Sequence, residues 1–215
     1  MIAYASRTGT KRNLAALRDA GWRLMVSARG VLRTEGFPYA LDNGAWTAFN
    51  RGEPFDVPAF EKAVKLLGQG ADFIILPDIV MGGVPSFEMS IAWLRKLRRR
   101  VALRGTRFLI AVQDGMETIA RRITRWLGPK VGIFVGGSTE WKLATMAKWA
   151  RIAHRRSAVC HVGRVNTARR IRFCEAAGVD SFDGSSASRF AVTLRPLELA
   201  RRQIDLEGYL TRLAA

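Results

Sequence analysis

Short apolar runs alternate with longer amphipathic segments through most of this chain, and this alternation constrains the fold more than any other feature. The short runs are predicted as strands, and the segments between most of them carry the spacing of helices with one buried face. The expected strands are residues 2–5, 24–27, 39–41, 73–76, 108–112, 131–135, 158–162 and 179–182. This order predicts repeated βα units around a parallel sheet.

Eight such strands predict a closed (β/α)₈ barrel, the TIM-barrel fold, within the α/β class. The expected helices are residues 11–20, 58–68, 86–100, 116–127, 140–155 and 167–177, whereas segment 28–38 is too short for a regular helix. At 215 residues the chain is near the lower length limit of about 200 for this fold, so we expect one domain over residues 1–215 with few insertions. A doubly wound open sheet is the alternative architecture.

Polar residues or glycines lie at or just after the end of nearly every expected strand from the third onward. They are Asp42, Asp78, Gln113, Gly136, Gly137, His161 and Asp183. Barrel enzymes gather their catalytic groups at the C-terminal ends of the strands. The placement of these residues therefore favours the barrel over the open sheet.

The charge of the chain points to a polyanionic partner. Lys and Arg number 35 against 18 Asp and Glu, which gives a net charge of +17. Such an excess in a soluble protein indicates nucleic acid, and a solvated arginine-rich surface is the alternative. The arginines expected to contact phosphates are Arg98, Arg99, Arg100, Arg155, Arg156, Arg169, Arg170 and Arg189.

Other classes of protein are not supported by the sequence. It has no apolar run of about 18 residues and no basic N-terminal segment before a long apolar stretch, so we expect no membrane span, no signal peptide and a cytoplasmic location. Cys160 and Cys174 are too few for a disulfide framework and, with His154 and His161, do not have the spacing of a zinc site. Both are expected to be reduced core residues.

The last expected strand ends in a carboxylate. Gly178-Val179-Asp180-Ser181-Phe182-Asp183 is followed by a Gly/Ser turn and by Arg189. An aspartate at a strand end before a flexible turn is well placed to act as a nucleophile. This order resembles the signature around the catalytic aspartate of tRNA-guanine transglycosylases. The resemblance implies that Asp183 is the nucleophile and that Arg189 binds a phosphate or orients a carboxylate, with a surface ion pair as the alternative role for Arg189.

Two further carboxylates match the order of that family. Leu41-Asp42-Asn43-Gly44 resembles the family's Asp-Ser-Gly-Gly segment, which implies that Asp42 is the general acid/base; a structural turn is the alternative. Asp78 matches the family's aspartate that binds the polar edge of the base, and a helix or turn cap is the alternative. A carboxylate suits guanine because N1–H and the exocyclic amine are adjacent donors.

The remaining matches concern the base pocket. Val112-Gln113 resembles the family's Val-Gln-Gly-Gly turn, which implies that Gln113 reaches the base carbonyl. Gly136 and Gly137 match a segment whose glycines let the backbone approach a flat base, although a plain strand-to-helix turn would also use them. His161 or Val162 matches the residue that covers one face of the base, and a structural role is the alternative for His161, since a single histidine at a strand end is more often structural than catalytic.

The resemblance covers about residues 39–189, and the chain lacks the family's zinc subdomain with three Cys and one His. In this it resembles the compact DpdA-type enzymes that insert 7-deazaguanine bases into DNA. The resemblance implies exchange of guanine in DNA for preQ0 or a relative through an aspartyl-nucleotide intermediate, without metal or cofactor, alongside partner proteins of the modification pathway. The alternatives are a tRNA-guanine transglycosylase, a nucleoside hydrolase or DNA glycosylase, and a non-catalytic nucleic-acid-binding accessory subunit.

Overall fold

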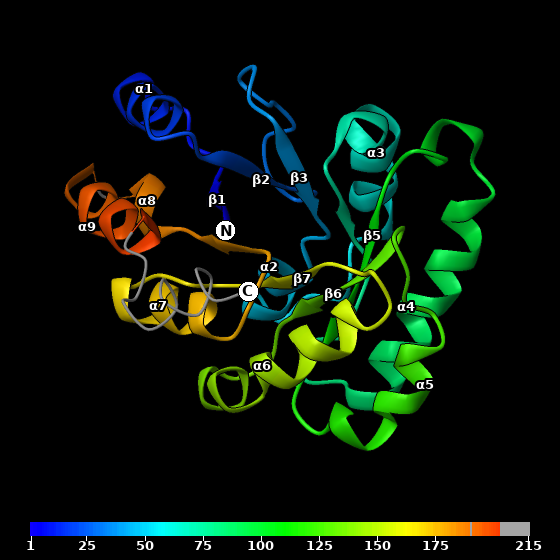
Figure 1. Ribbon diagram of the computed structural model, residues 1–215. Coiled ribbons are helices and arrows are strands. Elements are labelled where there is room, and N and C mark those ends of the chain that lie inside the picture. Colours follow the sequence, from blue (N-terminus) through cyan, green and yellow to red (C-terminus); the bar gives the residue numbers. More distant parts are fainter. Residues whose placement is uncertain (190, 203–215) are drawn as a thin grey trace.

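Eight parallel strands close into a barrel in the computed structural model, which describes residues 1–189 and 191–202 (Figure 1). The strands are β1 Ile2–Ser6, β2 Arg23–Ser27, β3 Tyr39–Asp42, β4 Ile74–Ile75, β5 Phe108–Val112, β6 Val131–Val135, β7 Cys160–Val162 and β8 Ser181–Gly184. They pair in chain order, and β8 pairs in parallel with β1. The closed order confirms the expected (β/α)₈ barrel and excludes the open doubly wound sheet.

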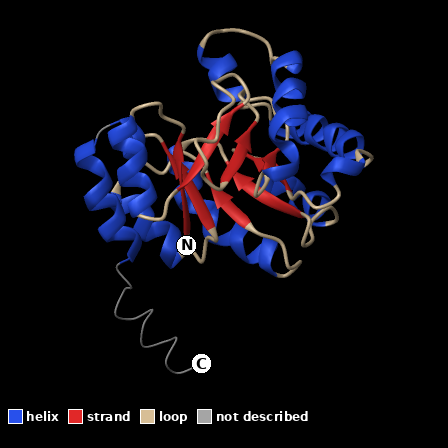
Figure 2. Cartoon of the chain, turned by 90° about the horizontal axis from the view of Figure 1, so that it is seen from above, coloured by secondary structure: helices blue, strands red, loops and turns tan. Residues whose placement is uncertain are grey.

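Helices lie outside the strands and cover the barrel (Figure 2). The described α-helices are α1 Lys11–Asp19, α2 Ala45–Asn50, α3 Val57–Leu67, α4 Gly83–Arg98, α5 Ala120–Thr124, α6 Thr139–His154, α7 Ala168–Ala176, α8 Ser186–Arg189 and α9 Ala191–Arg202. Short 3₁₀ turns are η1 Gly68–Gly70, η2 Val101–Leu103 and η3 Met116–Ile119. Helix α2 was not expected, since Asn43-Gly44 indicates a turn and the helix after it has only 6 residues.

Two apolar layers follow from the alternation of side chains along the strands. One cluster fills the barrel interior and includes Tyr4, Met25, Ala40, Phe73, Ile75 and Leu109, with Phe134 packed against it. The next residue along each strand faces the helices, as Leu41 and Phe182 do. Cys160 and Cys174 are free and buried in this outer layer, which confirms their expected role.

Helix α9 is attached to the first βα unit through Glu198. The Trp22 indole N–H donates to Glu198 Oε2 at 2.6 Å, and Arg201 pairs with the same carboxylate at 2.6 Å. Arg201 also donates to the carbonyl oxygen of Ala20 at 3.0 Å. These contacts fix the last described helix beside the start of the barrel. None of the described helices is long and apolar enough to cross a membrane.

Candidate active site

Asp42, Asp78 and Asp183 lie at one rim of the barrel. Asp42 is the last residue of β3, Asp183 lies near the end of β8, and Asp78 follows β4 by three positions. Because all eight strands are parallel in a closed barrel, their C-terminal ends meet at the same rim. The negative charges of Asp183 and Asp78 both act on Asp42, so the three carboxylates belong to one electrostatic cluster.

Asp183 is held by contacts on both of its carboxylate oxygens. Its Oδ2 lies 3.0 Å from His161 Nε2, and its Oδ1 accepts a long hydrogen bond of 3.3 Å from the backbone N–H of Arg164. His161 Nδ1 lies 2.8 Å from Ser181 Oγ. With a proton on Nε2, the imidazole donates to Asp183 and accepts from Ser181, which orients an ionised carboxylate. Oδ1 is therefore the less constrained oxygen of Asp183.

His161 does not lie where a residue that stacks on the base was expected. Its side chain is fully buried and packs among Tyr4, Phe73 and Phe134, with the Phe134 ring stacked at 5.5 Å. No face of the imidazole is left for a ligand. Val162 points the other way, into the layer between strands and helices. Neither side chain covers the rim where the carboxylates lie. Side chains alternate along β7, so His161 points into the barrel below Asp183 and Val162 points outward.

The pKa of Asp42 is raised to about 6, first by burial of the carboxylate and second by the charge of Asp183. The backbone N–H of Gly44 donates to Asp42 Oδ2 at 3.2 Å and opposes this rise, as does the hydroxyl of Ser27, its register partner on β2. A carboxyl group with such a pKa exchanges protons near neutral pH, as general acid/base catalysis requires. The environment of Asp42 is therefore suited to the expected role.

Two amide side chains hold Asp78. Asn43 Nδ2 donates to its Oδ1 at 2.7 Å, and Gln113 Nε2 donates to its Oδ2 at 3.1 Å. Burial raises the pKa of Asp78 to about 6, while the hydrogen bond from Asn43 and the charge of Arg164 oppose the rise. Asp78 keeps part of its surface exposed, so its remaining lone pairs can accept hydrogen bonds from a ligand.

Gln113 has other partners than the base carbonyl expected for it. Its amide nitrogen lies within hydrogen-bond distance of Asp78, of the Ile79 carbonyl at 2.8 Å and of Ser86 Oγ at 2.7 Å. The residue is buried, and its Oε1 has no hydrogen-bond partner among the residues that the structure describes. These contacts make Gln113 a positioning residue for Asp78, with a free acceptor beside it.

The Gly-Gly turn after β6 is explained by local geometry. The N–H of Gly136 donates to the Val112 carbonyl at 2.9 Å, so this amide is engaged in the sheet. Gly137 has a φ of 70°, and a Cβ there would lie 2.4 Å from an oxygen of Asp114. Asp114 in turn accepts from the Ser138 N–H at 2.7 Å, at the start of α6. Gly137 is thus required by the turn itself, whereas a Cβ at Gly136 would meet no atom closer than 3.4 Å, so the space around Gly136 does not require a glycine.

Arg164 is a site residue that the sequence reasoning missed. Its guanidinium carbon lies 3.9 Å above the centroid of the Trp46 ring, and its Nη2 donates to the Gly137 carbonyl. Trp46 follows β3 and Arg164 follows β7, which are opposite strands of the barrel, so the pair spans the rim above the carboxylates. Arg164 lies near a strand end, as Asp42 and Asp183 do, so its position in the sequence is a signal for the site. It was missed because only runs of arginines were considered as candidates.

The expected phosphate-binding arginines divide between the two ends of the barrel. Helix α4 has 16 residues and spans about 24 Å, so Arg98, Arg99 and Arg100 at its end lie away from the carboxylate rim and near the start of β5. Arg155 and Arg156 follow α6 and lie at the same far end for the same reason. These residues do not form one face with the site. Those at the carboxylate rim are Arg169 and Arg170 in the first turn of α7 and Arg189 at the end of α8.

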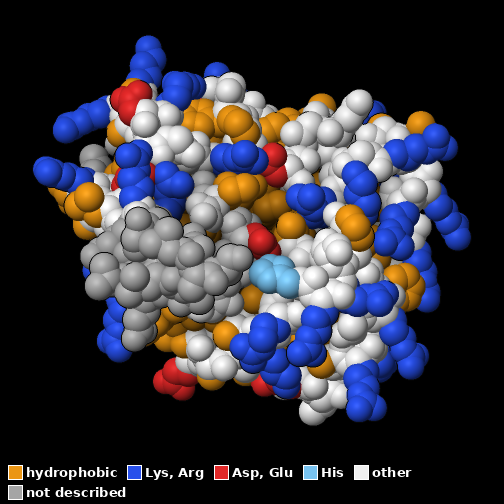
Figure 3. Space-filling view, viewed as in Figure 1, with side chains coloured by type: hydrophobic (Ala, Val, Ile, Leu, Met, Phe, Trp, Pro, Cys, Tyr) orange, Lys and Arg blue, Asp and Glu red, His pale blue; other side chains and the backbone are white. Residues whose placement is uncertain are grey.

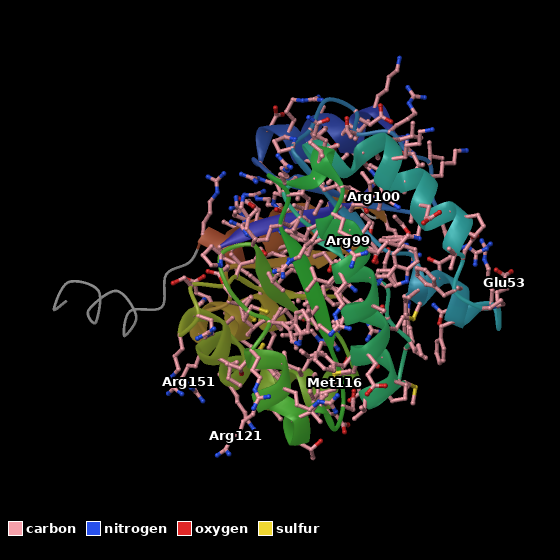
Figure 4. The ribbon with its side chains drawn as sticks, turned by 90° about the vertical axis from the view of Figure 1, so that its right-hand side faces the viewer. Glu53, Arg99, Arg100, Met116, Arg121 and Arg151 are labelled. Carbon is pink, nitrogen blue, oxygen red and sulfur yellow. The ribbon has the colours of Figure 1, made fainter. Side chains whose placement is uncertain are left out.

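Basic side chains are scattered over the face of the molecule that Figure 3 shows. Arg121 and Arg151 point away from the barrel on α5 and α6, well separated from Arg99 and Arg100 (Figure 4). A cavity of about 440 Å³ between α3 and η2 is also remote from the carboxylates, and Arg100 lines it. Neither net charge nor cavity size therefore locates the site, whereas the strand ends do.

No protein-family model and no curated protein matches this chain. Its class is defined by the fold and by the rim: a TIM barrel whose strand ends carry interacting carboxylates with raised pKa values. Among the described residues, no group of three or more His, Cys, Asp and Glu side chains is arranged to hold a metal ion.

Proposed function

We propose that this protein is a DNA-guanine transglycosylase that exchanges guanine for a 7-deazaguanine such as preQ0. The observation that carries the proposal is the pairing of Asp183, oriented by His161, with Asp42, whose pKa is raised to about 6. Two carboxyl groups in distinct environments can divide the roles of nucleophile and acid/base, as they do in retaining glycosidases.

In the first step, Asp183 Oδ1 attacks C1′ of the target nucleotide. The C1′–N9 bond breaks with its electron pair moving to guanine, and the proton of neutral Asp42 is transferred to the departing base. In the second step, the incoming 7-deazaguanine loses its proton to Asp42 and attacks C1′, and the ester bond to Asp183 breaks. The two steps restore the protonation state of both carboxyl groups.

Asp78 is assigned to the base. Its oxygens face N–H donors already, from Asn43 and Gln113, and guanine offers two more along one edge. The stacking surface that the sequence suggested at His161 is better supplied at Trp46, which remains 42% exposed although Arg164 lies over its ring and Phe49 stacks against it.

DNA is chosen as the substrate because the sequence resembles the enzymes that modify DNA, and the net charge of +17 suits a polyanion of either kind. A base inside a duplex has to be extruded before C1′ can be attacked, or else reached in a single strand. Arg169, Arg170 and Arg189 lie at the correct rim to hold the flanking phosphates.

The proposal is tested by incubating the protein with guanine-containing duplex DNA and radiolabelled preQ0 or guanine. We expect label to enter the DNA, and a protein–DNA adduct to be trapped by rapid denaturation. The Asp183→Asn protein is the negative control. If the wild-type protein releases guanine without incorporating any base, water replaces the second nucleophile and a DNA glycosylase is the correct assignment. If the protein exchanges no base in this DNA or in unmodified tRNA tested in the same way, the accessory-subunit alternative is favoured.

A further inference from the structure

A group of three cations lies beside the carboxylate rim, between α6, α7 and the end of β7. Lys142 belongs to the first turns of α6, Arg164 follows β7, and Arg170 belongs to the first turn of α7. All three line one small cavity. They are close enough that Arg164 and Arg170 both disfavour the charge on Lys142, while the charge of Asp183 favours it. Asp183 therefore compensates part of the positive charge, and an anion bound in the cavity would compensate more of it.

Lys142 is the most unusual member of this group. The residue is only 5% exposed, and its ammonium donates one hydrogen bond, to the Gly163 carbonyl at 2.7 Å. An ammonium has three donors, and the other two have no acceptor among the described residues. Burial, followed by the charge of Arg164, lowers the pKa of Lys142 to about 8. A buried lysine without a carboxylate partner is uncommon, since buried charges are nearly always paired.

Neither arginine makes an ion pair with a carboxylate in the part of the chain that the structure describes, although the charges of Asp183 and Asp114 favour the charged form of Arg164. Arg164 contacts a carbonyl and the Trp46 ring, and its N–H to Asp183 comes from the backbone. No side-chain hydrogen bond or ion pair of Arg170 is found among these residues, and only its backbone N–H is bonded, to Thr167 Oγ1 at 3.3 Å. The guanidinium donors of Arg170 are thus free for an anion.

We propose that Lys142, Arg164 and Arg170 form a phosphate subsite that binds a backbone phosphate next to the target nucleotide. The inference rests on the proposed function for the identity of the ligand, since Arg164 joins this subsite to Asp183. The cavity of about 10 Å³ has room for one water-sized group. One phosphate oxygen reaches Lys142 there, and the other oxygens face the two guanidinium groups, whose planar donors match a phosphate.

The sequence contains a signal for this subsite. Lys142 lies on the same helical face as Met146, Trp149 and Ala153, which are all buried. A lysine on the apolar face of an amphipathic helix either extends its side chain until the ammonium reaches water or pairs the ammonium with a buried acceptor. In this protein its amine stays at the rim end of α6, beside the reaction centre.

The subsite is tested first by titrating inorganic phosphate into the whole protein at constant ionic strength, followed by heteronuclear NMR or calorimetry. We expect Arg170→Gln and Lys142→Met to weaken phosphate binding tenfold or more. Arg172→Gln is the matched control, because Arg172 lies two residues further along α7, is exposed, carries the same charge and does not line the cavity. It should change binding less than twofold. Equal losses in the Arg172 and Arg170 variants would mean nonspecific charge attraction and would overturn the subsite.

A second measurement separates this inference from the proposed function. Base exchange is compared on a single-stranded DNA oligomer and on free deoxyguanosine, which has no phosphate. Arg170→Gln should raise the KM for the oligomer tenfold or more and leave that for the nucleoside unchanged. Normal exchange by Arg170→Gln and by Lys142→Met would contradict the phosphate subsite and leave the transglycosylase proposal unaffected. Phosphate binding that needs Lys142 and Arg170, in a wild-type protein that exchanges no base, would keep the subsite and remove the transglycosylase.

Discussion

Asp183 Oδ2 lies 3.0 Å from Nε2 of His161, and this contact joins two neighbouring strands of the barrel, β8 and β7. The imidazole is fully buried among aromatic rings and is held from its other side by Ser181. A fixed imidazole restricts the rotation of the Asp183 carboxylate, and preorganisation of this kind lowers the reorganisation needed during reaction. The position of the candidate nucleophile is therefore determined inside the barrel, below the rim.

Replacing Asp183 by Asn is expected to abolish both the covalent adduct and base exchange, since an amide is a poor nucleophile. Binding of DNA should change little, because the phosphate contacts come from other residues. The measurement is adduct formation by denaturing electrophoresis together with DNA binding by anisotropy. Asp180→Asn is the matched control: it lies three residues earlier, at the other end of the strand, and should keep at least a third of the activity. Normal exchange by the Asp183 variant would remove it from the nucleophile role.

The rate of adduct formation is expected to fall as the pH rises above about 6. Protonation of the leaving base needs neutral Asp42, whose pKa is raised to about 6 by burial and by the charge of Asp183. Once the pH is well above that value, each further unit should reduce the single-turnover rate about tenfold. The profile of Asp42→Asn should be low and flat over the same range. An unchanged pH profile in this variant would show that another group supplies the proton.

The same residue predicts an effect on stability. In the unfolded chain the pKa of an aspartate is about 3.9, and folding raises that of Asp42 to about 6. Folding therefore favours the neutral form, and stability is lost as the pH rises from the lower value through the upper one. Asp42→Asn should raise the free energy of unfolding at pH 8 by roughly 1–3 kcal/mol and change it little at pH 3.5. Urea denaturation at both pH values measures the difference.

The barrel could be predicted from sequence because the features that define it are local. Each strand is an apolar run, and the parallel order follows from the helices between the runs. The carboxylates could be found in the same way, since Asp42, Asp78 and Asp183 sit at strand ends along the chain. Helix α2 was missed because its 6 residues are too few for a clear period.

The roles of individual side chains could not be predicted as well, because they depend on tertiary contacts. His161 follows the strand-end rule but faces inward beneath Asp183, and only the closed barrel shows the aromatic rings around it. The arginine clusters at residues 98–100 and 155–156 were grouped with the site because charge runs are visible in sequence. The end of the barrel on which a helix terminus lies becomes clear only with the topology. Arg164 and Lys142 lie at the site but were not predicted, because each is a single cation outside the runs of basic residues.

Asp78→Ala is expected to weaken binding of the 7-deazaguanine base by about 1–3 kcal/mol, the usual consequence of leaving buried polar groups unpaired. Asn43 and Gln113 lose their common acceptor in this variant, so part of the effect comes from the pocket itself. Asp78→Asn, which keeps the shape, separates the two contributions. Competition assays with guanine and adenine measure selectivity, which should fall in both variants. Adenine competing as well as guanine in the wild-type protein would contradict the assignment of Asp78.

The last prediction concerns the nucleic acid and the two ends of the barrel. Binding to DNA should weaken steeply with salt, because phosphate contacts release counterions. If DNA lies over the carboxylate rim, Arg189→Gln should flatten this salt dependence and slow exchange. The triple variant Arg98→Gln, Arg99→Gln, Arg100→Gln removes three times the charge at the far end and is the matched control. We expect it to lower nonspecific affinity while exchange at saturating DNA stays within twofold of the wild type.

Exchange should be measured with duplex DNA, single-stranded DNA and unmodified tRNA at equal nucleotide concentration, because affinity for phosphate alone does not separate them. We expect incorporation into DNA at least tenfold faster than into tRNA. Incorporation confined to tRNA would overturn the choice of substrate and leave the chemistry of Asp183 and Asp42 intact. A triple variant that loses exchange while Arg189→Gln keeps it would place the nucleic acid at the far end of the barrel.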